Sequence, residues 1–118
     1  MDYSLVMITI VELPEFIKQA KKIFSVPLRE SLINYLAAHP KAGVIMEGTG
    51  GIRKIRWQRE GSGKSGGGRV VYYYHNDQYP LFLLTAFKKG KKANLTKEER
   101  NELAKFTRVL IETYGGKP

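Results

Sequence analysis

Apolar positions in the first third of the chain recur with the spacing of one strand followed by two helices. A β-branched and apolar run over Tyr3–Val11 predicts the first strand. Pro14 suits the first turn of a helix, and apolar residues follow at helical spacing from Phe16 to Phe24. Ser25 to Pro27 is expected to interrupt that helix. A second amphipathic helix is predicted from about Leu28 to Ala38.

The middle of the chain changes to the period of strands. Basic and apolar residues alternate from Ile52 to Arg59, and a β-branched, tyrosine-rich run covers Arg69–Tyr74. A glycine-rich loop joins these runs, so they predict two neighbouring strands. The preceding stretch, Val44–Gly51, contains too many glycines to predict a regular element.

The last third predicts a buried strand and one long helix. Leu81–Phe87 is apolar on both faces, which predicts a central strand covered on both sides. Thr96 and Glu99 have the spacing of a capping box. The apolar stripe of the helix they open comprises Leu103, Phe106, Leu110, Ile111 and Tyr114. The order βααβββα predicts an α+β fold, a single domain over residues 1–118 with a mostly antiparallel sheet packed against helices. The order of strands within the sheet does not follow from the pattern.

Composition restricts the chemistry. The 118 residues suffice for one hydrophobic core, and the absence of cysteine removes zinc-thiolate sites, disulfides and thiol nucleophiles. The two histidines lie far apart in sequence, so we expect no metal site and no cofactor. Apolar runs are broken well before ~18 residues, and the N-terminus does not resemble a signal segment. We therefore expect a soluble, cytoplasmic protein that does not associate with a membrane.

Positive charge is concentrated in the middle of the chain. The net charge is +9, and Gly50–Lys92 alone contains ten cations and two anions, a net +8. A solvated surface ordinarily mixes its signs, so this concentration predicts a polyanionic partner, with nucleic acid ahead of acidic protein or lipid. The alternative is a basic face that serves only solubility.

One glycine-rich segment imitates a nucleotide-binding motif. Gly63-Lys64-Ser65 has the ending of a phosphate-binding loop, but the glycine required five residues earlier is Gln58, and a strand follows in place of a helix. We interpret the segment as a hairpin loop whose Lys64 can reach a backbone phosphate.

Strand alternation predicts that three cations converge. If Ile55 and Trp57 face the core, Lys54 and Arg56 share the opposite face. Arg69 opens the next strand and can lie beside them across the hairpin. Solvated cations so arranged repel one another by a few tenths to ~1 kcal/mol per pair, and a bound phosphate would reverse that cost.

Four segments together resemble a known family. They are Gly48–Arg56, Gly63–Tyr73, Leu83–Phe87 and the stretch from Leu95 to Leu103. With the order βααβββα, they resemble the RelE/HigB superfamily of toxin-antitoxin ribonucleases, and most of all its HigB-type branch. The similarity covers roughly Ala37 to the C-terminus.

The resemblance implies an mRNA interferase that cuts translated messages in the ribosomal A site, against the 16S and 23S rRNA surfaces. A ribose 2′-hydroxyl attacks the scissile phosphate, usually without metal. A cognate helix-turn-helix antitoxin neutralises such a toxin, and the resulting hetero-oligomer can bind operator DNA through the antitoxin.

The resemblance also assigns residues. Lys54 and Arg56 match the basic positions of the family's second strand, Arg69 matches the arginine that opens the third, and Lys88 or Lys89 matches a basic residue after the fourth. The implied catalytic set is Lys54, Arg56, Arg69 and Lys89. The expected RNA contacts are Arg53, Arg59, Lys64, Tyr73, His75, Lys88, Lys91 and Lys92. Of these, Arg53 and Arg59 are expected on the Trp57 side or at the strand ends.

The chain departs from the family in one respect. Some members use a tyrosine near the final helix, and Leu95 lies at about that offset here. The group that removes the 2′-proton is therefore left open between Lys54, among its cationic neighbours, and His75.

Two other functions fit the same residues. One is a non-catalytic basic module that binds RNA or DNA through the same hairpin. The other is a subunit that binds an acidic protein partner, through cations such as Lys89 and Lys91.

Overall fold

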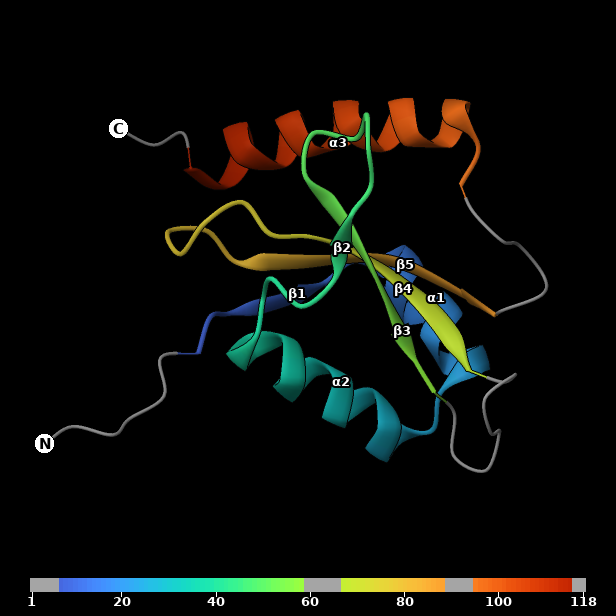
Figure 1. The fold of residues 1–118 in the computed structure, drawn as a ribbon. Helices are drawn as coiled ribbons and strands as arrows, with labels where there is room; N and C mark the ends of the chain where they lie inside the picture. The colour runs from blue at the N-terminus through green and yellow to red at the C-terminus, as the bar shows by residue number, and fades with distance from the viewer. Residues whose placement is uncertain (1–6, 59–66, 89–94, 116–118) are drawn as a thin grey trace, which may run out of the picture.

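The computed structural model describes residues 7–58, 67–88 and 95–115, and in these ranges it contains one sheet and three helices (Figure 1). The α+β class and the mostly antiparallel sheet confirm the fold predicted from the sequence. The strands are β1 (Ile10–Glu12), β2 (Val44–Ile45), β3 (Ile52–Trp57), β4 (Gly68–Tyr73) and β5 (Leu81–Lys88). The helices are α1 (Pro14–Ile23), α2 (Val26–Ala38) and α3 (Lys97–Gly115).

The strands lie in the order β1-β5-β4-β3-β2. β1 runs parallel to β5, and the other neighbours are antiparallel. The first and last strands of the chain are therefore adjacent, with β5 between β1 and β4. This position confirms the central strand predicted from its two apolar faces.

β2 corrects the prediction of an irregular connection over Val44–Gly51. Val44 and Ile45 pair with Lys54 and Arg53 of β3 and form the edge of the sheet. The glycines begin after this pair, and Gly48, Gly50 and Gly51 have positive φ angles that turn the chain back toward β3. Two β-branched residues beside an unpaired strand edge are enough to add a short strand.

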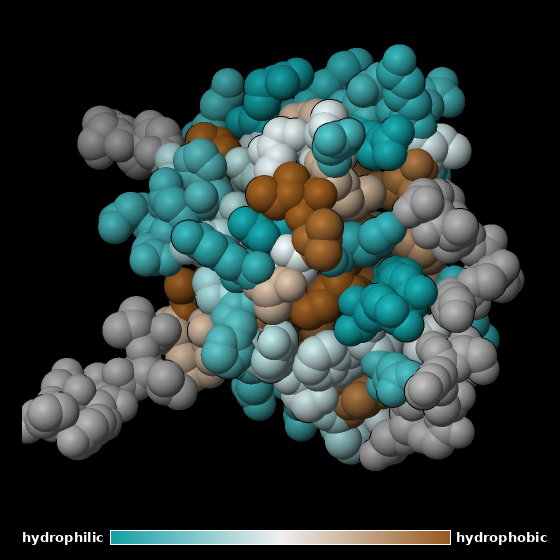
Figure 2. Space-filling model, in the orientation of Figure 1, coloured by the Kyte–Doolittle hydropathy of each residue, from teal (hydrophilic) through white to brown (hydrophobic). Residues whose placement is uncertain are grey.

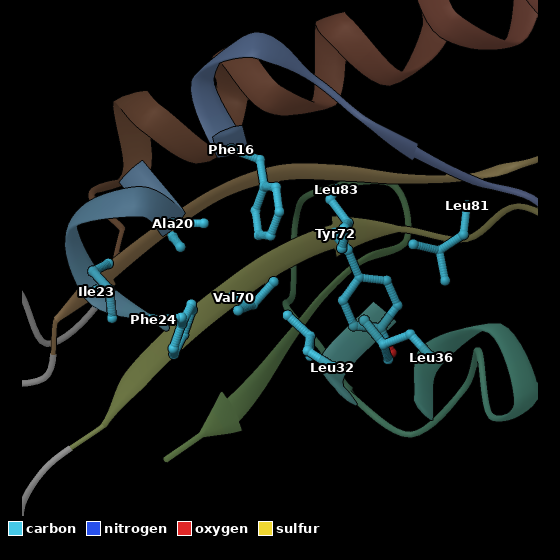
Figure 3. Packing of buried hydrophobic residues seen from close by; sticks show 11 residues of the cluster. Phe16, Ala20, Ile23, Phe24, Leu32, Leu36, Val70, Tyr72, Leu81 and Leu83 are labelled. Carbon is cyan, nitrogen blue, oxygen red and sulfur yellow. The ribbon is translucent and has the colours of Figure 1, made fainter. Parts of the chain in front are cut away.

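The helices cover both faces of the sheet, α1 and α2 on one and α3 on the other (Figure 1). We call the two apolar clusters the α1–α2 core and the α3 core. Figure 3 shows the α1–α2 core, in which Phe16, Leu32 and Leu36 pack against Val70 and Tyr72. The α3 core includes Ile52, Val71, Phe82, Leu84 and Leu110. Alternate residues of β3 and β4 enter opposite cores. β5 alternates on either side of a register shift, where Leu84 is skipped between Leu83 and Thr85, the partners of Tyr72 and Val71.

The helix starts follow from local chemistry. α1 begins at Pro14 as predicted, but α2 begins at Val26, about two residues before the predicted start. Ser25 Oγ accepts a hydrogen bond from the Leu28 N–H (3.2 Å), and Pro27 lies in the first turn, where a missing N–H costs nothing. The break expected at this segment is therefore the N-cap of α2.

The capping box predicted for the last helix is present. The Thr96 N–H donates to Glu99 Oε1 (2.8 Å), and the Glu99 N–H donates to Thr96 Oγ1 (3.0 Å). The predicted apolar stripe is only partly buried, because Leu110 is in the core whereas Phe106 and Tyr114 are exposed.

The first strand is shorter than predicted. β1 begins at Ile10, since only Ile10–Glu12 pair with β5. Residues 7–9 precede the strand, and the rest of the predicted segment lies outside the described residues.

One buried hydroxyl ties the loop before β2 to the sheet. Tyr72 is fully buried, and its hydroxyl donates to the Pro40 carbonyl (2.9 Å) and accepts from the Gly43 N–H (2.7 Å). Burial raises the pKa of Tyr72, so the hydroxyl keeps its proton. A Cβ at Gly43 would lie 2.8 Å from the Tyr72 ring and hydroxyl, so only glycine fits.

Among the helices of the described ranges, none has the length and apolar character needed to cross a membrane.

Candidate nucleic-acid interface

Three cations lie on the α3 side of β3 and β4, and we call them the cation cluster: Lys54, Arg56 and Arg69. Ile55 and Trp57 pack against the α1–α2 core, so Lys54 and Arg56 project to the opposite face, as predicted. Arg69 shares its face with Val71, which belongs to the α3 core. The sheet therefore presents all three cations on one face.

The register of the hairpin sets their spacing. Arg56 and Arg69 are direct Cα partners, and Lys54 pairs with Val71, which makes Lys54 and Arg69 diagonal neighbours. Direct partners in an antiparallel pair have Cβ atoms about 4.5–5.5 Å apart, and diagonal ones lie roughly 7–8 Å apart. At both spacings, long side chains such as lysine and arginine can contact the same phosphate.

The cluster is open to solvent. Arg56 is exposed, and Lys54 and Arg69 are half-buried. Among the described residues, no carboxylate forms a salt bridge with Arg56 or Arg69. Arg69 Nη1 makes one long contact, 3.5 Å to the Gly68 carbonyl. Guanidinium groups on rigid strands, not neutralised by carboxylates, are suited to a phosphate, which they can bind with two parallel hydrogen bonds.

A second group of polar aromatic residues lies near the other end of β4. The Tyr73 hydroxyl is 3.2 Å from His75 Nδ1, and the Tyr79 ring meets the His75 ring edge-on at 4.7 Å. Burial raises the pKa of Tyr73. The Tyr73 ring belongs to the α3 core and is 5% exposed, so no face is free to stack on a base.

Comparison with known proteins identifies the family. The model of the RelE toxin of the RelE/RelB toxin-antitoxin system matches residues 28–115. The chain belongs to this family. It is also similar in fold to the solved structure of a free double arginine-to-alanine mutant of the E. coli toxin RelE, with a TM-score of 0.56 at 19% identity. That match covers 88% of this chain and 99% of the other. Membership confirms the RelE part of the resemblance, while the HigB branch stays a prediction.

Two of the expected RNA contacts of this RelE-family toxin lie away from the cation cluster. Arg53 is on the α1–α2 side, where its Nη1 donates to the carbonyls of Lys41 (3.1 Å) and Gly43 (2.8 Å). Lys88 lines a shallow hollow with Lys22 and Ile23 of α1, again on the opposite face. Arg53 thus fixes the loop before β2, and we no longer place either residue at the phosphate.

His75 is also distant from the Arg56–Arg69 pair of the cluster. It follows Tyr73, which pairs with Ile52, whereas Arg69 pairs with Arg56, four residues away along the strand. At ~3.3 Å per residue, these two rungs are about 13 Å apart. His75 therefore lies toward the Lys54 end of the cation cluster, beyond Tyr73, and away from the Arg56–Arg69 rung.

The remaining predicted site residues of the RelE-family toxin lie outside the described residues: Arg59, Lys64, Lys89, Lys91 and Lys92. In the described ranges, no three histidine, aspartate or glutamate side chains gather to hold a metal ion.

Proposed function

We propose that this toxin is an endoribonuclease that cleaves translated mRNA, with the cation cluster binding the scissile phosphate. The observation that carries the proposal is the convergence of Lys54, Arg56 and Arg69 on one open face. Family membership supports the same reading. Like charges directly opposite each other destabilise a hairpin, and Arg56 lies directly opposite Arg69. A bound anion would offset this repulsion, which gives the pair a function.

The proposed reaction needs only the RNA and the side chains of the protein. The ribose 2′-oxygen forms a bond to the adjacent phosphorus, the bond from phosphorus to the 5′-oxygen breaks, and the electron pair leaves with that oxygen. The 2′-proton passes to a base, and the leaving oxygen takes a proton. The products carry a 2′,3′-cyclic phosphate and a 5′-hydroxyl.

The cation cluster would act on the transition state. The pentacoordinate phosphorane carries more negative charge than the starting diester, so fixed cations stabilise it more than they stabilise the substrate. Loss of one such donor typically costs ~3 kcal/mol, or roughly 100-fold in rate. Lys54 is our candidate for the proton-transfer group, because it is the member of the cluster that can exist as a neutral amine.

We extend the proposal to the ribosome and to the antitoxin. A cation cluster on an open face gives little enclosure to a single RNA strand, so a second surface must orient the message. The ribosomal A site would supply that surface, and we assign Lys64, Lys91 and Lys92 to contacts with RNA there and Lys89 to the catalytic set. The family's toxin-antitoxin pairing makes an antitoxin the neutralising partner.

Expression in a bacterial cell tests the proposal. The wild type is expected to arrest growth and to generate new mRNA ends within reading frames, and Arg69→Ala is expected to relieve both effects. Lys18→Ala is the matched control, because Lys18 is an exposed cation of α1 on the other side of the sheet. Arrest without new mRNA ends would favour a non-catalytic binding module and refute the nuclease.

The ends of the cleaved RNA test the mechanism. Mapping should find a cyclic phosphate on the upstream fragment and a 5′-hydroxyl on the downstream fragment. A message with one 2′-deoxynucleotide at the cleaved position should remain intact at that site. Cleavage of the deoxy substrate would overturn the proposed 2′-hydroxyl attack.

A further inference from the structure

A groove of about 850 Å³ lies beside β5, between the start of α1 and the first half of α3. Its lining includes four consecutive residues of β5, from Leu84 to Phe87. These residues come from both faces of the strand, Leu84 and Phe87 from the α3 core and Ala86 from the α1–α2 core, so the hollow follows the edge of the strand.

β1 covers only the first part of this edge. It pairs with Leu81, Phe82 and Leu83, and the Leu13 N–H donates to the Leu83 carbonyl (3.1 Å). β5 continues to Lys88, and among the described residues no strand pairs with it on this side beyond Leu83. The backbone groups of an uncovered strand edge are a template for another strand.

The α3 wall of the groove combines apolar side chains with glutamates. Its apolar residues are Leu103 and Phe106, with Leu95 just before the helix. The helical stripe predicts that Phe106 is in the core, yet its side chain is 38% exposed and faces the groove. An aromatic ring in this position offers apolar area to a partner without any rearrangement of the core.

The described charged side chains that line the groove are acidic, in a chain that is basic overall. Its described lining contains four glutamates and no cation, in a chain of net charge +9. Glu15 accepts a hydrogen bond from Gln19, and Glu99 caps α3. Glu98 and Glu102 are exposed, and Glu102 lies 3.7 Å from Lys105 in a solvated pair that contributes little. These carboxylates repel RNA and attract a cationic polypeptide.

We propose that this groove binds an extended segment of a partner protein, which adds a strand to β5 beyond Leu83. Side chains of an added strand alternate between the two faces of the sheet. Every second residue of the segment therefore faces α3, where apolar side chains meet Leu103 and Phe106 and lysine or arginine side chains reach Glu98 and Glu102. The family's toxin-antitoxin pairing provides a protein of this kind. The inference does not depend on RNA cleavage, because the groove contains no member of the cation cluster.

An unbiased display library of peptides of about ten residues, enough for one strand, tests the inference on the full chain. Peptides with apolar and basic residues at every second position are expected to be enriched. An enriched peptide, synthesised and labelled, should bind at least about tenfold more weakly to Glu102→Lys and to Phe106→Ser, as measured by fluorescence anisotropy.

Two variants on the same helix are matched controls. Glu112→Lys makes the same charge change and Val109→Ser the same loss of apolar area at exposed positions that do not line the groove, so both should bind as the wild type does. Amide exchange at residues 85–88 should slow when the peptide binds, which a helical occupant would not cause.

Three results would each overturn the proposal: no enrichment of basic peptides, equal binding by Glu102→Lys and Glu112→Lys, or binding without protection of the β5 amides. Glu102→Lys is expected to cleave mRNA as the wild type does. The docking proposal and the nuclease proposal can therefore fail independently.

Discussion

Replacing Tyr72 with phenylalanine should destabilise the protein by about 2 kcal/mol. The substitution keeps the buried ring but removes the hydroxyl that joins the Pro40 carbonyl and the Gly43 N–H. The Gly43 N–H is buried and would lose its acceptor, at a cost of about 1–3 kcal/mol, while the half-buried Pro40 carbonyl keeps some access to water. Unfolding entropy near 2.1 cal/mol/K per residue gives ~0.25 kcal/mol/K for this chain, so Tm should fall by about 8 °C.

Urea denaturation and thermal melting would measure the effect. The urea midpoint should fall with an unchanged m-value, because the surface exposed on unfolding hardly changes. Tyr114→Phe is the control, since that exposed ring packs against Phe82 and no described residue accepts from its hydroxyl. Its stability should remain within about 0.5 kcal/mol of the wild type. Equal stability of the two variants would refute the view that the Tyr72 hydroxyl holds the loop.

Three further predictions concern the site and the same tether. Arg56→Ala should reduce mRNA cleavage about 100-fold, whereas His75→Ala should change it only a few-fold, because His75 lies beyond the Tyr73 rung, itself about 13 Å along the sheet from the Arg56–Arg69 rung. Equal losses in a quantitative cleavage assay would contradict this. Gly43→Ala should lower the free energy of unfolding by about 1–3 kcal/mol, since its Cβ would meet Tyr72 at 2.8 Å, and an unchanged urea midpoint would disprove the clash. Burial raises the pKa of Tyr72 and Tyr73 above 10.0, so the free energy of unfolding should be fully retained below pH 10 and should fall as the pH rises further. Urea titration should show a shallower fall in Tyr72→Phe, and an identical pH dependence would count against burial as the cause.

Local patterns in the sequence were sufficient for most elements and for the faces of the strands. The capping box of α3, Pro14 at the start of α1 and the two-residue period around Ile55 and Trp57 each depend on residues only a few positions apart. The alternation alone placed Lys54 and Arg56 on one face, with Arg69 across the hairpin, and the structure agrees. The start of α2 was misjudged because Pro27 can either interrupt a helix or occupy its first turn.

Contacts between distant segments required the tertiary structure. Arg53 and Arg56 are equally basic in the sequence, but only the fold shows that the Arg53 guanidinium donates to Lys41 and Gly43. The pattern assigned Phe106 to a buried stripe, yet β1 stops at Glu12, which leaves the edge of β5 uncovered and Phe106 beside a groove.

The sequence by itself determined the class of fold, the family and the concentration of positive charge, because each is written in neighbouring residues or in composition. Only the tertiary structure decided the parallel pairing of β1 with β5 and the groove, lined by glutamates, beside the uncovered edge of β5. These features depend on which strand edges meet after some seventy residues of intervening chain, and no local periodicity specifies that pairing.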